Sequence, residues 1–172
     1  MTGRNLRLSL VLAALVAALS ASAASAGPIR PGTLPVTMTL PSGWASSAPA
    51  NGARFDASAP SGYGRLEITT GGSFPEALPF SEFVKTETSS ARSAYRHEDP
   101  KAVVSGRKLS FASGPVVEIT ATVHHGTPLS IVIYSFLHGG VTYHFTYFTY
   151  TTSIHALRGA FLASAKSVHF TK

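Results

Sequence analysis

The chain has 172 residues, with 14 Lys and Arg against 8 Asp and Glu, and it has no cysteine. The lack of thiols excludes disulfide bonds, thiol catalysis, thiolate metal sites and lipid attachment at an N-terminal cysteine. The basic excess is mild and scattered along the chain, unlike the clustered Lys and Arg with interleaved aromatics of a nucleic-acid binder. It allows at most a weak attraction to anionic surfaces.

The first 26 residues have the pattern of a cleavable signal peptide. Arg4 and Arg7 are followed by an apolar run at residues 8–19, which is short for a membrane span, and by small residues at 24–26. We therefore expect a secreted, extracytoplasmic protein that begins at Gly27, with no stable membrane span after cleavage and no lipid anchor.

Short strands and turns are expected in the next part of the chain. Residues 27–34 predict a flexible lead, and the only tryptophan, Trp44, is expected to anchor the chain in the core after a Pro-Gly turn. The small polar residues 46–52 predict a loop. Alternating residues predict strands at 36–40, 53–57 and 64–70.

Two segments have the apolar spacing of amphipathic helices. Residues 80–96 predict the first helix, with Ser81 as its N-cap, and Asp99 and Pro100 end it. Residues 154–165 predict the second helix, with Ser153 as its N-cap. The polar face of the first helix is expected to be a solvated surface.

The longest strands follow the first helix. Residues 101–112 predict an irregular strand with a bulge at Gly106, and residues 116–124 alternate regularly. The segment 129–152 has two strand-like runs around Gly139 and Gly140, which predicts a hairpin with His138 paired to Val141. Consecutive hairpins predict an α+β fold: a mainly antiparallel sheet of about six strands flanked by helices.

The order of these elements resembles the PsbP-like α/β/α sandwich family. The resemblance rests on LPSGW at residues 40–44, FSEF at 80–83, the hairpin at 131–150 and the closing segment at 161–167. The family includes the extrinsic photosystem II subunit, a Ran-binding nuclear-import factor and many bacterial envelope proteins. It implies a single domain at residues 35–172 that binds partners and has no shared catalytic residues.

One polar row is the sharpest candidate for chemistry. If the loop at 125–128 pairs His124 with Leu129, Glu118 lies opposite Ser135 and Ser135 lies opposite His144. These are the residue types of a nucleophilic triad. The serine would nevertheless lie in mid-strand, without a nucleophile elbow or oxyanion donors, so we expect a hydrogen-bonded row and no catalytic site.

An aromatic face is the candidate for ligand binding. Five side chains of the central hairpin could line a groove if no helix covers them, and would otherwise form core. They are Tyr134, Phe136, Tyr143, Phe145 and Tyr147.

The histidines do not predict a metal site. The tips that carry His124 and His125, on one side, and His138, on the other, lie about 30 Å apart along a shared strand. We expect no metal and no cofactor, and exposed histidines in loops. The seven histidines are His97, His124, His125, His138, His144, His155 and His169.

Three functions remain open. The first is a secreted, non-enzymatic binding or adaptor domain that acts on an unknown protein or envelope component. The alternative is a carrier of a small molecule or lipid that uses the aromatic face. The third is a weak hydrolase built on Glu118, Ser135 and His144.

Overall fold

The computed structural model describes residues 27–49, 52–75, 78–124 and 126–171. The expected signal peptide at residues 1–26 lies outside the described residues. No helix in the described part of the chain is long and apolar enough to cross a membrane.

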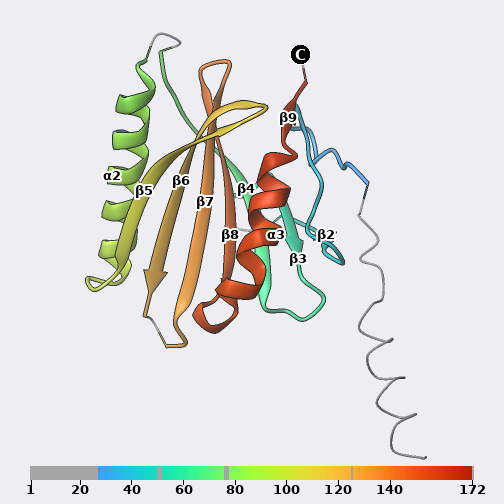
Figure 1. The fold of residues 1–172 in the computed structure, drawn as a ribbon, viewed down its shortest axis with the longest axis vertical. Helices are drawn as coiled ribbons and strands as arrows, with labels where there is room; N and C mark the ends of the chain where they lie inside the picture. Colours follow the sequence, from blue (N-terminus) through green and yellow to red (C-terminus); the bar gives the residue numbers. More distant parts are fainter. Residues whose placement is uncertain (1–26, 50–51, 76–77, 125, 172) are drawn as a thin grey trace, which may run out of the picture.

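A seven-stranded antiparallel sheet forms the centre of the molecule, in the order β2-β3-β4-β8-β7-β6-β5 (Figure 1). This confirms the α+β fold. The strands are β2 (Ala45–Ser47), β3 (Phe55–Ser58), β4 (Gly64–Ser73), β5 (Val103–Phe111), β6 (Gly114–Val123), β7 (Leu129–His138) and β8 (Val141–Tyr150).

A short second sheet joins the two ends of the described chain. In it, β1 (Val36–Thr37) pairs antiparallel with β9 (His169–Phe170). The main sheet has seven strands where about six were expected. β2 forms where a loop was predicted, and the strand predicted at 36–40 shortens to β1 and belongs to the second sheet. The small, exposed residues of β2 pair with β3 at the edge of the main sheet, where apolar alternation is not required.

The central hairpin has the predicted register. His138 pairs with Val141, and Gly139 and Gly140 both have positive φ angles, of 57° and 73°. Two successive positive φ angles are the requirement of the tight type I′ turn, which explains the two glycines. This register decides which residues of β7 and β8 face each helix.

The two α-helices of the described residues, α2 and α3, lie on opposite faces of the sheet (Figure 1). α2 (Phe80–Glu98) packs on β5 and β6, while α3 (Ile154–Lys166), which follows the 3₁₀ turn η2 (Thr151–Ser153), packs on β7 and β8. Two separate cores result. Phe83 fills the core beneath α2, whereas Trp44 and Phe161 fill the core beneath α3.

Neither serine acts as the expected helix cap. α2 begins at Phe80 with Pro79 at the N-cap position, and the Pro79 carbonyl accepts hydrogen bonds from the Glu82 and Phe83 amides. Ser81 therefore lies inside the first turn. At α3, Ser153 occupies the N-cap position but makes no capping hydrogen bond with its side chain.

The expected bulge at Gly106 is wrong, because β5 and β6 keep an unbroken register through it. A Cβ atom at Gly106 would lie 2.0 Å from the Thr88 Oγ1 atom of α2. The glycine thus allows the helix to approach the strand closely. The register shift occurs instead in β4, between Thr70 and Ser73.

Residues 27–34 are joined to the domain and do not form the expected lead. Ile29 and Met38 exchange two backbone hydrogen bonds of 2.7 and 3.0 Å. Leu34 is only 6% exposed and belongs to the core beneath α3. The apolar side chains of this segment, which its prolines and glycine obscure in the sequence, attach it to the fold.

Candidate functional site

The aromatic face of the central hairpin is core. Its five side chains are at most 7% exposed, and α3 and the segment that contains β1 and Trp44 cover them. The Phe161 ring stacks on Tyr147 at 4.7 Å, and Phe111 contacts Tyr134 at 6.0 Å between ring centroids. A groove would require that no element covers this face. The five side chains are covered and therefore do not line a groove: Tyr134, Phe136, Tyr143, Phe145 and Tyr147.

The predicted polar row is wrong in one of its two pairs. Ser135 lies opposite His144 as expected, but Leu129 pairs with Val123, so Glu118 lies opposite Tyr134. Because side chains alternate, this slip of one residue turns Glu118 to the opposite face.

This register accompanies a contact between His124 and Asp99, which are distant in the sequence. The His124 amide donates a 2.8 Å hydrogen bond to the Asp99 carboxylate, and His124 lies outside the ladder, so the hairpin loop is longer than predicted. The Asp99 carboxylate also accepts from the Lys101 amide, and these backbone N–H groups hold the pKa of Asp99 below its usual range.

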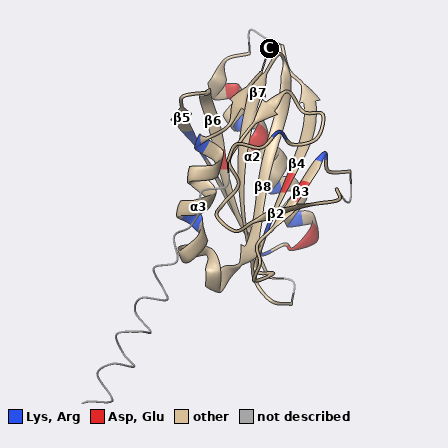
Figure 2. Ribbon diagram, turned by 90° about the vertical axis from the view of Figure 1, so that its right-hand side faces the viewer, with Lys and Arg blue, Asp and Glu red and all other residues tan. Residues whose placement is uncertain are grey.

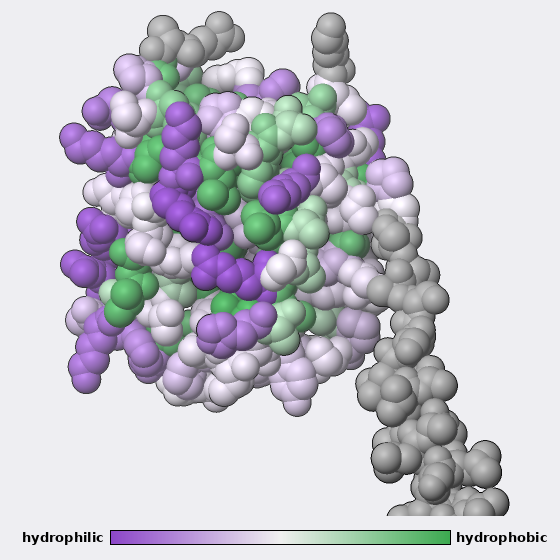
Figure 3. Space-filling view, viewed as in Figure 1, coloured by the Kyte–Doolittle hydropathy of each residue, from purple (hydrophilic) through white to green (hydrophobic). Residues whose placement is uncertain are grey.

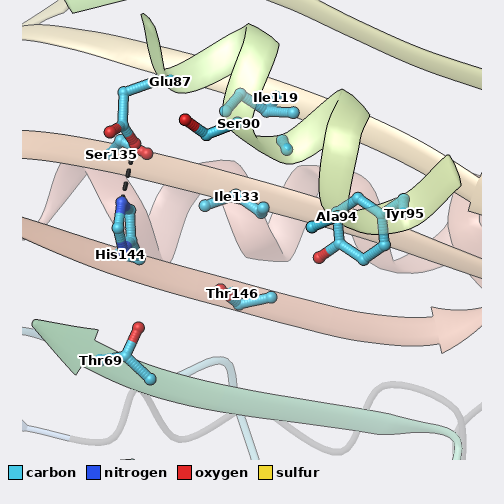
Figure 4. Close-up of a pocket in the computed structure, with 11 residues that line it drawn as sticks. Thr69, Glu87, Ser90, Ala94, Tyr95, Ile119, Ile133, Ser135, His144 and Thr146 are labelled. Atoms are coloured by element: carbon cyan, nitrogen blue, oxygen red, sulfur yellow. Dashed lines mark hydrogen bonds and ion pairs between the residues drawn. The ribbon is translucent and has the colours of Figure 1, made fainter. Parts of the chain in front are cut away.

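An open groove runs along α2, where the helix leaves part of the sheet uncovered (Figure 4). Its volume is about 260 Å³. Apolar side chains from β6, β7 and α2 line it, together with polar side chains from β4, β7, β8 and α2. The lining residues are Thr69, Glu87, Ser90, Ala91, Ala94, Tyr95, Ile119, Ile133, Ser135, His144 and Thr146.

A hydrogen-bonded pair, Glu87 and His144, closes one end of this groove. Glu87 points from α2 toward the sheet, and its Oε2 lies 2.7 Å from the His144 Nε2 of β8 (Figure 4). The two side chains are only 10% and 25% exposed. Glu87 was not predicted as a site residue, because the polar side of the helix was expected to face solvent. Its spacing of four residues from both Phe83 and Ala91, on the apolar stripe, was the available signal.

Ser135 presents a buried hydroxyl beside this pair (Figure 4). It is fully buried, and its Oγ atom has no hydrogen-bond partner among the described residues. An unsatisfied buried hydroxyl costs about 1–3 kcal/mol. A polar group of a molecule that reached this hydroxyl would remove the cost.

The geometry does not activate Ser135 as a nucleophile. The His144 Nε2 atom is engaged with Glu87, and no hydrogen bond joins Ser135 to His144. Ser135 also lies within β7, paired to β6 and β8, so its neighbouring amides serve the ladder. The arrangement suits recognition of a polar group.

A tyrosine lies at the other end of the groove. Tyr95 lies at the end away from Glu87 (Figure 4), and burial raises the pKa of Tyr95 to about 12, so its phenol stays a hydrogen-bond donor. On the same face, Arg65 contacts Asp56 at 3.0 Å and Glu67 at 2.7 Å. Burial is the largest cause that raises the pKa of Glu67.

Other charged residues are dispersed (Figure 2). His124 contacts Asp99 at 3.4 Å, and His138 stacks on Phe170 at 4.3 Å between ring centroids. His125 lies outside the described residues. Among the residues that the structure describes, no group of three or more His, Asp or Glu could hold a metal ion.

Comparison with known proteins gives the fold. No protein-family model and no curated protein matches the chain. The chain is similar to the solution structure of cyanobacterial PsbP (CyanoP) from Synechocystis sp. PCC 6803, with a TM-score of 0.62 and 10% identity over 88% of this chain and 95% of that one.

Two further solved structures are similar. LpqN, involved in cell envelope biogenesis of Mycobacterium tuberculosis, has a TM-score of 0.58 and 9% identity over 84% of this chain and 90% of its own. A protein from Bacteroides thetaiotaomicron has a TM-score of 0.51 and 13% identity over 80% of this chain and 46% of its own. The chain thus has a PsbP-like fold, as the sequence motifs predicted.

Proposed function

We propose that this protein is a secreted, non-enzymatic binding domain that recognises a partner of the cell envelope or the extracellular space through the groove along α2. The partner is a protein or an envelope component that inserts a polar group beside Ser135. The observation that carries the proposal is the fully buried Ser135 hydroxyl, which lacks a partner among the described residues and lines an open groove.

The shape and chemistry of the groove support binding. Ile119 and Ile133 provide an apolar floor, while Glu87 and His144 provide a hydrogen-bonded polar end that is largely removed from water. Such a mixture of apolar area and few polar groups is typical of binding sites. The alternative, a carrier that uses the aromatic face, is not supported, because those aromatic side chains are buried in the core.

The signal-peptide pattern at residues 1–26 supports export. The similarity to LpqN, a protein involved in cell envelope biogenesis, supports an envelope partner only by analogy of fold. Intact mass of the protein recovered from its own cells tests the export step. A mass that begins at Gly27 is expected, and a mass that includes residue 1 would contradict it.

Affinity capture from the cell-envelope extract tests binding, with mass spectrometry of both proteins and lipids. Ala94 is exposed at the groove, so Ala94→Trp fills the groove without removing a contact. Ser93→Trp, at the neighbouring exposed position outside the groove, is the matched control.

We expect a reproducible partner with the unchanged protein and with Ser93→Trp, and its loss with Ala94→Trp. Equal recovery with both variants would place the binding surface elsewhere. Turnover of an ester probe that disappears in Ser135→Ala would overturn the non-enzymatic part of the proposal.

A further inference from the structure

A second recess lies on the opposite face of the sheet, between β5, β6 and α3. Its volume is about 270 Å³, and its lining residues are Ser105, Gly106, Arg107, Glu118, Thr120 and Arg158. The face that carries α3 has hydrophilic side chains in its middle, bordered by apolar ones (Figure 3). The groove along α2 shares none of these residues.

One buried carboxylate organises this recess. Glu118 is 2% exposed, and its two oxygens accept hydrogen bonds from different arginines: Oε2 from the Arg107 Nε–H, and Oε1 from Arg158 Nη2 at 3.2 Å. The Tyr134 phenol also donates to Oε1, at 3.4 Å. These bonds fix two guanidinium groups that come from β5 and α3, which are far apart in the sequence.

The two arginines have more donors than Glu118 can use. A guanidinium group has five N–H donors, and Arg107 and Arg158 each give one nitrogen to Glu118. The two side chains are 61% and 46% exposed, so their other N–H groups can reach an incoming molecule. The three charges sum to +1, because one arginine suffices to neutralise the carboxylate.

The environment keeps these groups ready to donate. The hydrogen bond to Glu118, and next its charge, raise the pKa of Arg107, which therefore stays charged. Ser105 and Thr120 lie at the same recess, joined by a 2.8 Å hydrogen bond between their hydroxyls. Two guanidinium forks with hydroxyls beside them form a donor set that matches the oxygens of a phosphate group.

We propose that the recess formed by Arg107 and Arg158 around Glu118 binds a phosphate-type oxyanion, either free or as part of a lipid headgroup. Glu118 is a positioning residue: it orients both guanidinium groups before the anion arrives. This site is independent of the groove along α2 and does not depend on the proposed function.

Binding of two probes tests the site, with the protein expressed from the full sequence. Inorganic phosphate is titrated by calorimetry, and flotation compares vesicles of phosphatidylglycerol with vesicles of phosphatidylcholine. Arg158→Gln and Arg158→Lys are compared with Arg92→Gln, which removes an exposed positive charge from α2. Arg158→Lys keeps the charge that neutralises Glu118 but lacks the planar fork, so it separates specific recognition from folding and from net charge.

We expect affinity for phosphate, for phosphatidylglycerol vesicles, or for both, to fall at least tenfold in Arg158→Gln and in Arg158→Lys, with Arg92→Gln unchanged. Binding of inorganic phosphate would identify a free anion as the ligand, and binding of the anionic vesicles alone would identify a headgroup. If neither probe binds, or if Arg92→Gln weakens binding as much as Arg158→Gln, the site does not exist.

Discussion

The close approach of α2 to β5 gives the sharpest structural prediction. A Cβ atom at Gly106 would lie 2.0 Å from Oγ1, 2.9 Å from Cγ2 and 3.0 Å from Cβ of Thr88. Overpacking of this kind destabilises a protein by about 1–3 kcal/mol, whereas replacing a glycine in a strand by alanine stabilises it by about 0.5–1 kcal/mol. Gly106→Ala is therefore expected to lower the free energy of unfolding by about 0.5–2 kcal/mol.

Thr88→Ala provides a clean background for this test. The Thr88 Oγ1 atom is buried without a hydrogen-bond partner among the described residues, so its removal costs little. In this background the two closest atoms are gone, and Gly106→Ala should be nearly neutral. A coupling energy of about 0.5–2 kcal/mol is expected from the double-mutant cycle.

Urea unfolding measures all four proteins, with the fluorescence of Trp44 as the signal, since Trp44 lies in the other core. Because Glu87 precedes Thr88, displacement of α2 should also disturb its 2.7 Å contact with His144. The His144 imidazole resonances report this change. The same loss of stability from Gly106→Ala in both backgrounds would refute the argument.

Three further predictions concern other parts of the fold. Backbone N–H groups hold the pKa of Asp99 below its usual range. The unchanged protein should therefore be more stable than Asp99→Asn above about pH 4, and this difference should vanish as the pH falls through the pKa of Asp99 in the folded state. A difference between the two urea midpoints that does not depend on pH would contradict this. Phe161→Ala should cost about 3–5 kcal/mol and shift Trp44 emission to longer wavelength, because the two rings lie 5.8 Å apart; unchanged emission would count against the contact. Deleting residues 27–34 should lower the free energy of unfolding by about 1.5–3 kcal/mol through the loss of buried Leu34. If the shortened and the full protein had equal urea midpoints, residues 27–34 would be the flexible lead that the sequence predicted.

Local patterns predicted most of the fold. The alternation in β6, β7 and β8 and the pair Gly139–Gly140 fixed the hairpin, because side-chain alternation and turn geometry act over a few residues. The strand β2 was missed, because an exposed edge strand requires no apolar pattern.

The candidate site was harder to predict, because distant contacts decide it. The Asp99 carboxylate accepts a hydrogen bond from the amide of His124, 25 residues away. His124 does not pair with Leu129, so Glu118 lies on the face opposite to the predicted one. The pairing of Ser135 with His144 was predicted correctly. The hydrogen-bond partner of His144 is Glu87, which lies 57 residues earlier in the sequence and was not predicted. Short-range periodicity contains no information on such contacts, although the position of Glu87 on an apolar stripe hinted at burial.

The two proposed sites follow from one property of the architecture. In the described part of the chain, one helix lies on each face of the seven-stranded sheet, α2 over β5 and β6 and α3 over β7 and β8. Each face therefore has a margin beside its helix, and a glutamate is buried at each margin, Glu87 on one face and Glu118 on the other.

A charge buried at such a margin must be paired, and its partners then define what the recess can bind. Glu87 engages one histidine and leaves Ser135 unsatisfied, which suits an uncharged polar group, whereas Glu118 engages two arginines, which suits an anion. Because the sheet separates the recesses, Ala94→Trp should not alter phosphate binding, and Arg158→Gln should not alter partner capture. An effect of either variant on the opposite site would mean that the two faces are coupled through the strands.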